Sequence, residues 1–323
     1  MSPAGHVVLE PGPPRTLLGG AATLQLIPLG QDNLGWRLTC NATGATALVD
    51  GPDAVPYLES LASLGLTLSA LFITHTHGDH IGVAADLQGR RQIALRRGEA
   101  DPWPGLRTFG PRPRAAEVPG LTDAVDEGDE VALGALRLQV WRTEGHLRGH
   151  ISYVLADEKG EKGEKGAIFC GDTMFGGGCG YLFDGPPAAM LASLQRIAAL
   201  PPTTLLCCAH EYTWDNLHFA LSVAGADPAY AAALGDRITR CRDLRAAGRS
   251  TLPSTIGEER ATNPFLHAAQ LVAALPDRGA EAATVPPDAA AAFTALRAAK
   301  DSRLYKPSVP PDPSLTLRSG SVT

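Results

Sequence analysis

Short apolar runs alternate with turn residues over the first two thirds of the chain, which is the pattern of successive strands. The runs TLQLIPL, GWRLTC and TALVDG, from Thr23 onward, predict strands of one sheet. The apolar positions of Val55–Leu64 have helical spacing, and LSALFITHTH then predicts a buried strand that ends in a polar loop. Further strands are predicted at RQIALRR, EVALGALRLQVWRT, ISYVLAD, AIFCGDT and TLLCCAHEY, and a helix at Met190–Leu200.

After residue 212 the composition becomes rich in Ala, Leu and Arg, and the apolar spacing becomes helical, as in AYAAALGDRITRCRDLRAAG and DAAAAFTALRAAK. The pattern therefore predicts an α/β domain over residues 23–212 and a smaller helical domain over residues 213–306. Three segments outside these elements predict flexible or solvated chain: the extension 1–22, the EKG repeat at 158–166 and the Pro-rich tail 307–323.

Charge and composition narrow the classes of protein. The 323 residues include 28 Lys and Arg against 34 Asp and Glu, a formal net charge of -6, so a nucleic-acid partner is not expected. No apolar run is long enough for a membrane span, and the N-terminus lacks the pattern of a secretory signal. The six cysteines are not spaced like a disulfide framework. We therefore expect a cytoplasmic monomer without a membrane partner, and leave an organelle matrix and an oligomer as alternatives.

Potential metal ligands are concentrated in THTHGDH, directly after a predicted buried strand. His75 and His77 are two positions apart and can point together from an extended loop, whereas Asp79 and His80 can turn toward a second point. A metal ion in a protein generally takes three or four protein ligands, so this cluster alone can begin two sites.

Three further predicted strands end in a potential ligand: His146 follows LQVWR, Asp172 follows AIFC and His210 follows LLCC. Loops at the ends of several strands can bring their side chains to one point. Each residue alone has an ordinary alternative, either a core histidine with satisfied hydrogen bonds or an aspartate that caps a turn. Together with the first cluster they complete a set of five histidines and two aspartates.

These motifs resemble those of a known enzyme family. The string H-x-H-x-D-H with downstream His, Asp and His resembles the metallo-β-lactamase superfamily, and longer segments resemble glyoxalase II, the hydroxyacylglutathione hydrolases. The segments are PLGQDNLGWRL, TEGHLRGHISYVL, FCGDTMFGGGCGYLFDG, CCAHEYTWDNLHFA, TLPSTIGEERATNPF and ALRAAKD, and they span roughly residues 24–306 without the EKG repeat. The resemblance implies an αββα sandwich followed by a smaller C-terminal α-helical domain.

The resemblance also implies two divalent metal ions per chain, with zinc expected first and iron or manganese as alternatives. The two aspartates that it implies as catalytic are Asp79 and Asp172, and Asp172 would bridge both ions beside a hydroxide. Asp50 and His150 resemble residues that orient ligand imidazoles, with a packing or capping role left open. The remaining implied ligands are His75, His77 and His146 for one ion, and His80 and His210, with Asp79, for the other.

Substrate-binding residues are implied as well. Arg297 and Lys300, in ALRAAKD, match the pair that binds the glycine carboxylate of glutathione in this family, and Tyr212 matches a substrate-contacting tyrosine. Without the resemblance, such an Arg–Lys pair would indicate a solvated helix face. Tyr181 and Phe183 depart from the family pattern of a basic residue followed two positions later by an aromatic. One lost charged hydrogen bond at Tyr181 would weaken substrate binding by about 1.5–3 kcal/mol.

The implied reaction is hydrolysis of S-2-hydroxyacylglutathione, typically S-D-lactoylglutathione, to glutathione and D-lactate, as in methylglyoxal detoxification. The nucleophile would be the metal-bridging hydroxide, so no serine is needed, and no G-x-S-x-G motif occurs. Two alternatives remain: a glutathione-persulfide dioxygenase with a single iron, and a hydrolase of the same fold that acts on a different thioester. The complete set of ligand positions argues against the dioxygenase.

Overall fold

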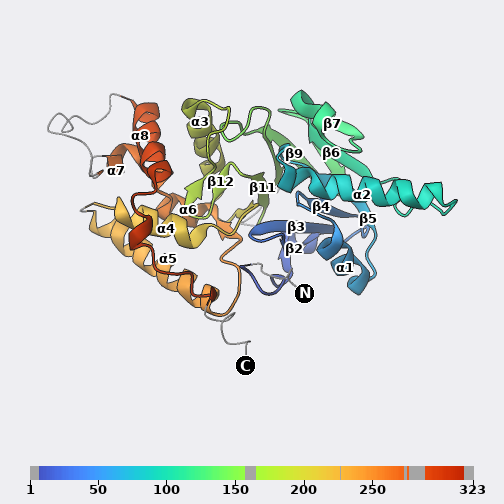
Figure 1. Ribbon diagram of the computed structural model, residues 1–323, viewed down its shortest axis with the longest axis horizontal. Helices are drawn as coiled ribbons and strands as arrows, with labels where there is room; N and C mark the ends of the chain where they lie inside the picture. Colours follow the sequence, from blue (N-terminus) through green and yellow to red (C-terminus); the bar gives the residue numbers. More distant parts are fainter. Residues whose placement is uncertain (1–6, 157–164, 226, 273–274, 276–287, 316–323) are drawn as a thin grey trace.

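The computed structural model describes residues 7–156, 165–225, 227–272, 275 and 288–315, which include two large sheets (Figure 1). In the first sheet the strands follow chain order, antiparallel from β1 to β4 and parallel from β4 to β7. Its strands are β1 (Arg15–Leu17), β2 (Ala22–Leu29), β3 (Asn33–Cys40), β4 (Thr46–Val49), β5 (Leu68–Phe72), β6 (Arg107–Pro111) and β7 (Asp123–Val125).

The second sheet has the order β15-β14-β11-β10-β9-β8, in which only β11 and β14 pair in parallel. Its strands are β8 (Glu130–Leu133), β9 (Leu136–Arg142), β10 (Ile151–Leu155), β11 (Ala167–Gly171), β14 (Leu205–Cys208) and β15 (Ser254–Thr255). A small hairpin of β12 (Met174–Phe175) and β13 (Gly178–Cys179) follows β11.

Helices cover the outer faces of this pair of sheets (Figure 1). Helices α1 (Val55–Leu64) and α2 (Gly78–Arg96) share a buried apolar cluster with β2, β4 and β5 of the first sheet. Helix α3 (Pro187–Ala198) packs Met190, Leu194 and Ile197 into the main core. Between the sheets, Phe72 stacks on Tyr153 with ring centroids 4.8 Å apart. The layers are therefore those of an αββα sandwich, which confirms the predicted fold class.

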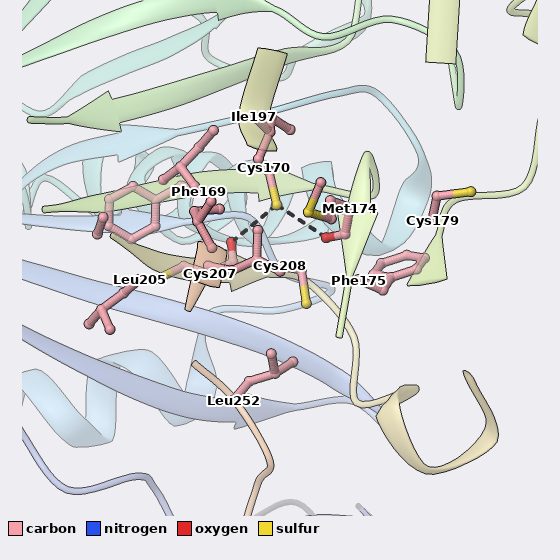
Figure 2. Packing of buried hydrophobic residues seen from close by; sticks show 14 of the residues in the cluster. Phe169, Cys170, Met174, Phe175, Cys179, Ile197, Leu205, Cys207, Cys208 and Leu252 are labelled. Carbon is pink, nitrogen blue, oxygen red and sulfur yellow. Dashed lines mark hydrogen bonds between the residues drawn. The ribbon is translucent and has the colours of Figure 1, made fainter. Parts of the chain in front are cut away.

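The core of the second sheet lies directly behind the β12–β13 hairpin. Figure 2 shows Phe169 and Cys170 of β11 among Met174, Ile197 and Cys207. The Cys170 thiol donates to the carbonyl of Met174 at 3.2 Å, which ties the hairpin to the strand before it. Burial raises the pKa of the Cys170 thiol well above its usual range, so it acts as a small apolar group here.

The helical region begins at α4 (Thr213–Ser222) and packs against α3 and the β12–β13 hairpin. Three of its helices start at capping residues, because the side chains of Asp227, Thr255 and Asp288 accept from the backbone at the start of α5, α6 and α8. The aromatic rings of Phe265 and Phe293 meet at 5.6 Å in its core. The other helices are α5 (Pro228–Ala246), α6 (Ile256–Thr262), α7 (Ala268–Leu271) and α8 (Ala289–Ser302). None of the described helices is long and apolar enough to cross a membrane.

One predicted strand is wrong. The segment RQIALRR is the second half of helix α2, whose buried face continues through Val83, Leu87 and Ala94. Ile93 and Leu95, which produced an alternating pattern, are each 51% exposed. Their alternation therefore reflects two exposed apolar residues on a helix surface rather than a half-buried strand. The predicted strand EVALGALRLQVWRT is also divided, because it folds as the β8–β9 hairpin.

The described parts of the two ends that were predicted to be flexible contact the rest of the chain. Within 1–22, Val8 is fully buried and β1 pairs with β2. Within 307–323, Ser314 is fully buried and the indole of Trp214 donates to the carbonyl of Pro310 at 2.8 Å. Arg245 accounts for much of this order, since its guanidinium donates both to Val7 and to Ser314. Residues 158–164 of the EKG repeat and residues 316–323 lie outside the described residues.

Candidate metal centre

The seven candidate ligands lie on loops at one edge of the two sheets. Strands β9, β11 and β14 run in the same direction, so their carboxyl ends share an edge. The loop after β5 joins this edge because the backbone N–H of Ile151 donates to the carbonyl of Thr74 at 2.9 Å. The ligands after these strands are His75, His77, Asp79 and His80 (β5 and the start of α2), His146 (β9), Asp172 (β11) and His210 (β14).

Gly171 allows this convergence at the end of β11. Its φ of 48° favours glycine. A Cβ at this position would lie 2.3 Å from the hydroxyl oxygen of Thr74 and 2.8 Å from Nε2 of His150. The absence of a side chain therefore lets Asp172 follow β11 directly into the cluster of imidazoles.

The ligand atoms form three overlapping groups, and within each group they lie no more than 4.8 Å apart. In the first group, Nδ1 of His77 is 3.1 Å from Nε2 of His75 and 3.0 Å from Nε2 of His146. In another, Oδ2 of Asp79 is 3.3 Å from Nε2 of His210. The groups are His75, His77 and His146; His75, His80 and Asp172; and Asp79, His80 and His210.

Asp172 faces both ends of this arrangement. Its Oδ2 atom is 3.5 Å from Nε2 of His146, whereas its Oδ1 atom is 3.5 Å from Nε2 of His80 and 3.6 Å from Nε2 of His210. One carboxylate oxygen thus points to each of two ligand groups. A carboxylate placed in this way could be shared by two cations.

The donor atoms fit a pair of divalent cations. Three buried side-chain atoms among the described residues lack a hydrogen-bond partner, and two of them are His80 Nε2 and Asp172 Oδ1. Leaving such atoms unpaired costs about 1–3 kcal/mol each, so each needs a ligand. The imidazole nitrogens of His75, His77 and His146 also converge, although neutral imidazoles have only one N–H each. Imidazole and carboxylate donors at such spacings suit zinc, iron or manganese.

The charges within the cluster also favour bound cations. Burial alone would raise the pKa of Asp172, but the positive charges of His210 and His80 outweigh it and lower that pKa strongly. Burial lowers the pKa of His210, but Asp172 and Asp32 outweigh it and raise that pKa to about 9. His75 differs, because burial and the neighbouring imidazoles both lower its pKa well below 6.5. The carboxylates are thus ionised, and cations that bind here would replace the protons on His80 and His210.

Groups behind the ligands fix their orientation. Asp50 accepts from Nδ1 of His80 at 3.0 Å and from the backbone N–H and hydroxyl of Thr74 at 2.8 and 2.7 Å. His150 lies against the ring of His75 at 4.8 Å, and its Nε2 atom accepts from the backbone N–H of Asp172 at 3.2 Å. Both contacts leave the metal-facing nitrogen or oxygen of the ligand directed into the cluster.

The structure adds two residues that the sequence reasoning missed. The carboxylate of Asp32 accepts from Nδ1 of His210 at 2.9 Å, and the amide of Asn33 donates to Oδ2 of Asp79 at 2.9 Å. Asp32 lies in the turn between β2 and β3 and Asn33 is the first residue of β3, so both are far from their partners along the chain. The only sequence signal was their position in the segment PLGQDNLGWRL, which resembles the family.

Three candidate substrate residues place aromatic rings at the edge of the cluster. Tyr212 stacks on His210 with ring centroids 4.7 Å apart and is 36% exposed. The ring of Phe183 lies 4.8 Å from that of His77 and 5.0 Å from that of Tyr181. Tyr181 and Phe183 are both more than half exposed, so aromatic surface borders the metal ligands at this point.

Arg297 of α8 connects to the same region through the β12–β13 hairpin, and Lys300 lies about one turn further along the same helix. Both are more than nine-tenths buried, and the Arg297 guanidinium donates to the carbonyl of Cys179 at 3.1 Å. Two residues further on, the carbonyl of Tyr181 accepts from Nδ1 of His146 at 2.7 Å. A single short segment of chain therefore links the Arg297 guanidinium to the candidate ligand His146.

Comparisons with known proteins agree with this geometry. Residues 38–210 match the family model of the metallo-beta-lactamase superfamily, and residues 211–303 match that of the hydroxyacylglutathione hydrolase C-terminus. A hydroxyacylglutathione hydrolase of Synechococcus sp. is 40% identical over 85% of this chain and 97% of its own. One from Cupriavidus taiwanensis is 43% identical over the same shares.

Among solved structures, ETHE1 from Myxococcus xanthus is similar with a TM-score of 0.50 and 25% identity, covering 81% of this chain and 95% of its own. This likeness supports the fold, and the family match over residues 211–303 identifies the helical region. The chain therefore belongs to the hydroxyacylglutathione hydrolase family, within the metallo-beta-lactamase superfamily.

Proposed function

We propose that the protein is a metal-dependent thioester hydrolase that converts S-2-hydroxyacylglutathione, such as S-D-lactoylglutathione, to glutathione and D-lactate in methylglyoxal detoxification. The observation that carries this proposal is the position of Asp172, whose two carboxylate oxygens face two groups of imidazoles. The chain also belongs to the family of hydroxyacylglutathione hydrolases. Its relatives bear that name over nearly their whole length.

The proposed ligands divide as the distances suggest, with zinc as the first candidate metal. His75, His77 and His146 would hold one ion, and Asp79, His80 and His210 the other, with Asp172 shared between them. When bound, two such ions would lower the pKa of a coordinated water molecule and polarise the thioester carbonyl.

The chain's own residues supply position and charge. Asp172 and Asp79 stay ionised, because neighbouring imidazoles hold both pKa values below their usual range despite burial. Tyr212 and Phe183 form apolar surface beside the ligands, which excludes water from one side of the reacting group. A thiolate is a good leaving group, so no strong acid is required beside it.

Glutathione recognition is proposed for Arg297 and Lys300, whose charges suit the glycine carboxylate. Tyr181 has an aromatic ring and a hydroxyl where the family pattern has a cation. The affinity for the part of the substrate that contacts this position would therefore depend on stacking. Arg114 is not free to replace that cation, because its guanidinium pairs with Asp184 at 2.8 Å and with Glu117 at 3.1 Å. A different glutathione thioester is therefore the second candidate substrate.

The six cysteines are all unpaired and buried, which supports the proposal of a reducing, cytoplasmic location. We propose a monomer without a nucleic-acid partner, in keeping with the net charge of -6.

The test of the function is a comparison of kcat/KM for S-D-lactoylglutathione with that for its analogue lacking the glycine carboxylate. A charged hydrogen bond contributes about 1.5–3 kcal/mol, so the analogue should be at least about tenfold poorer. Absence of hydrolysis of either thioester by the metal-loaded protein would refute the proposed function. Equal values for the two would refute the role of Arg297 and Lys300.

A further inference from the structure

A carboxylate lies against one of the two proposed substrate cations. Asp215, in the first turn of α4, accepts from the Lys300 ammonium at 2.8 Å and from the Tyr305 hydroxyl at 2.6 Å. Its other oxygen accepts from the ammonium of Lys306. The three donors fix the Asp215 carboxylate on both oxygens, and this contact joins α4 to α8 and to the segment that follows it.

The surroundings of Lys300 make its charge depend on this contact. The ammonium lies over the ring of Tyr305 at 4.7 Å and over that of Phe219 at 5.2 Å, in a position that is 90% or more buried. Burial lowers the pKa of Lys300 to about 8, although Asp215 opposes this shift. Arg297 and Lys306 also face it and lower the pKa further.

Other charged groups at this point do not replace Asp215. Asp301, on α8, is engaged by the guanidinium of Arg297 at 3.0 Å. On the hairpin side, burial raises the pKa of the Cys179 thiol, so that thiol adds no negative charge at neutral pH. Asp215 is therefore the carboxylate that stabilises the charged form of Lys300.

We propose that Asp215 is a positioning residue, which keeps the Lys300 amine protonated and directed so that it can hold a carboxylate of the glutathione moiety. This inference rests on the proposed function. An ammonium has three N–H groups, and the Asp215 contact uses one, so two remain for the substrate. Asp215 thus acts on the substrate through Lys300 and does not itself meet the reacting thioester.

In the wild type, the KM for S-D-lactoylglutathione should rise as the pH passes about 8, because Lys300 then loses its proton. In Asp215→Asn the same rise should occur below neutral pH, which raises KM about tenfold at neutral pH while kcat changes little. Lys300→Arg keeps its charge over the whole range, so its KM should not depend on this step.

The experiment measures kcat and KM from about pH 6 to about pH 9. The variants are Asp215→Asn, Asp215→Glu, Lys300→Arg and the double variant, with Asp243→Asn on α5 as the control for an exposed ion pair. We expect Asp215→Glu to restore most of the wild-type profile, and Asp215→Asn to have little effect when Arg occupies position 300. An unchanged KM profile in Asp215→Asn would overturn the inference. An equal rise of KM on Asp215→Asn with and without Lys300→Arg would also overturn it, because that result would indicate a purely structural role.

Glutathione binding, measured by calorimetry on the same variants, separates this inference from the proposed function. If the wild type hydrolyses no glutathione thioester, the proposed function fails. The inference then stands if glutathione binding weakens above about pH 8 in the wild type and already at neutral pH in Asp215→Asn. It falls if binding is absent or independent of pH in both.

Discussion

Replacing Glu259 with glutamine should destabilise the fold much more than the same change at its neighbour Glu258. Glu259 of α6 is fully buried, and its carboxylate accepts from the guanidinium of Arg237 at 2.5 Å and from the hydroxyl of Ser254 at 2.6 Å. It also accepts from the backbone N–H of Gly177 at 2.8 Å, in the turn of the β12–β13 hairpin. One charge therefore holds the helical region to the hairpin that leads into the metal centre.

Glu259→Gln leaves the guanidinium of Arg237 buried without its charged partner, and this sets the loss in the free energy of unfolding. Glutamine keeps the shape but removes the charge, and Arg237 stays only 3% exposed. Breaking a buried pair in this way costs about 3–5 kcal/mol. Since Glu258 lies 3.5 Å from the Arg237 guanidinium and compensates in part, we expect about 3 kcal/mol. Glu258 itself forms an exposed pair with Arg240, so its change to glutamine should cost less than about 1 kcal/mol.

The assay is urea unfolding of the metal-loaded protein, with the free energy of unfolding taken from the midpoint and slope. Combining Glu259→Gln with Arg237→Met should cost less than the sum of the single changes, because the second change removes the stranded charge. Similar losses for Glu259→Gln and Glu258→Gln would refute the reasoning.

Three further outcomes are expected. Asp50→Asn should weaken metal affinity by about 10–100-fold in competition with a chelator, because it releases the imidazole that it orients; an unchanged affinity would contradict this role. Gly180→Ala should lower kcat, since its Cβ would lie 2.0 Å from the carbonyl of Asp172, whereas Gly235→Ala meets open space and should not. Arg245→Met should make both chain ends more sensitive to limited proteolysis, because this buried guanidinium holds them, and equal cleavage rates would argue against that anchor.

Patterns in the sequence predicted an α/β domain, a helical domain and the convergence of the ligands, whereas the αββα layers were implied only by the family resemblance. Strands that end in a ligand, such as AIFC before Asp172 and LLCC before His210, are local patterns with a physical meaning. The structure brings all seven candidates into one cluster, as those patterns indicated. Their role as ligands stays a prediction until metal is measured.

What the sequence could not predict depends on contacts between distant segments. Asp32 meets His210 across 178 positions, and Asp215 meets Lys300 across 85, so no local pattern marks either contact. The error at RQIALRR has a different cause, because Ile93 and Leu95 imitate a strand while lying exposed on α2. The order of the chain ends likewise depends on one buried side chain, Arg245, which contacts both.

The central claim is that two metal ions share the carboxylate of Asp172. The most direct test is the metal content per chain, by mass spectrometry of the elements, for the wild type and for Asp172→Ala, with Asp129→Ala at an exposed ion pair as the control. The account predicts two ions in the wild type and in Asp129→Ala, and loss of at least one in Asp172→Ala. Two ions retained in Asp172→Ala, or a single ion in the wild type after saturation with zinc, would contradict it.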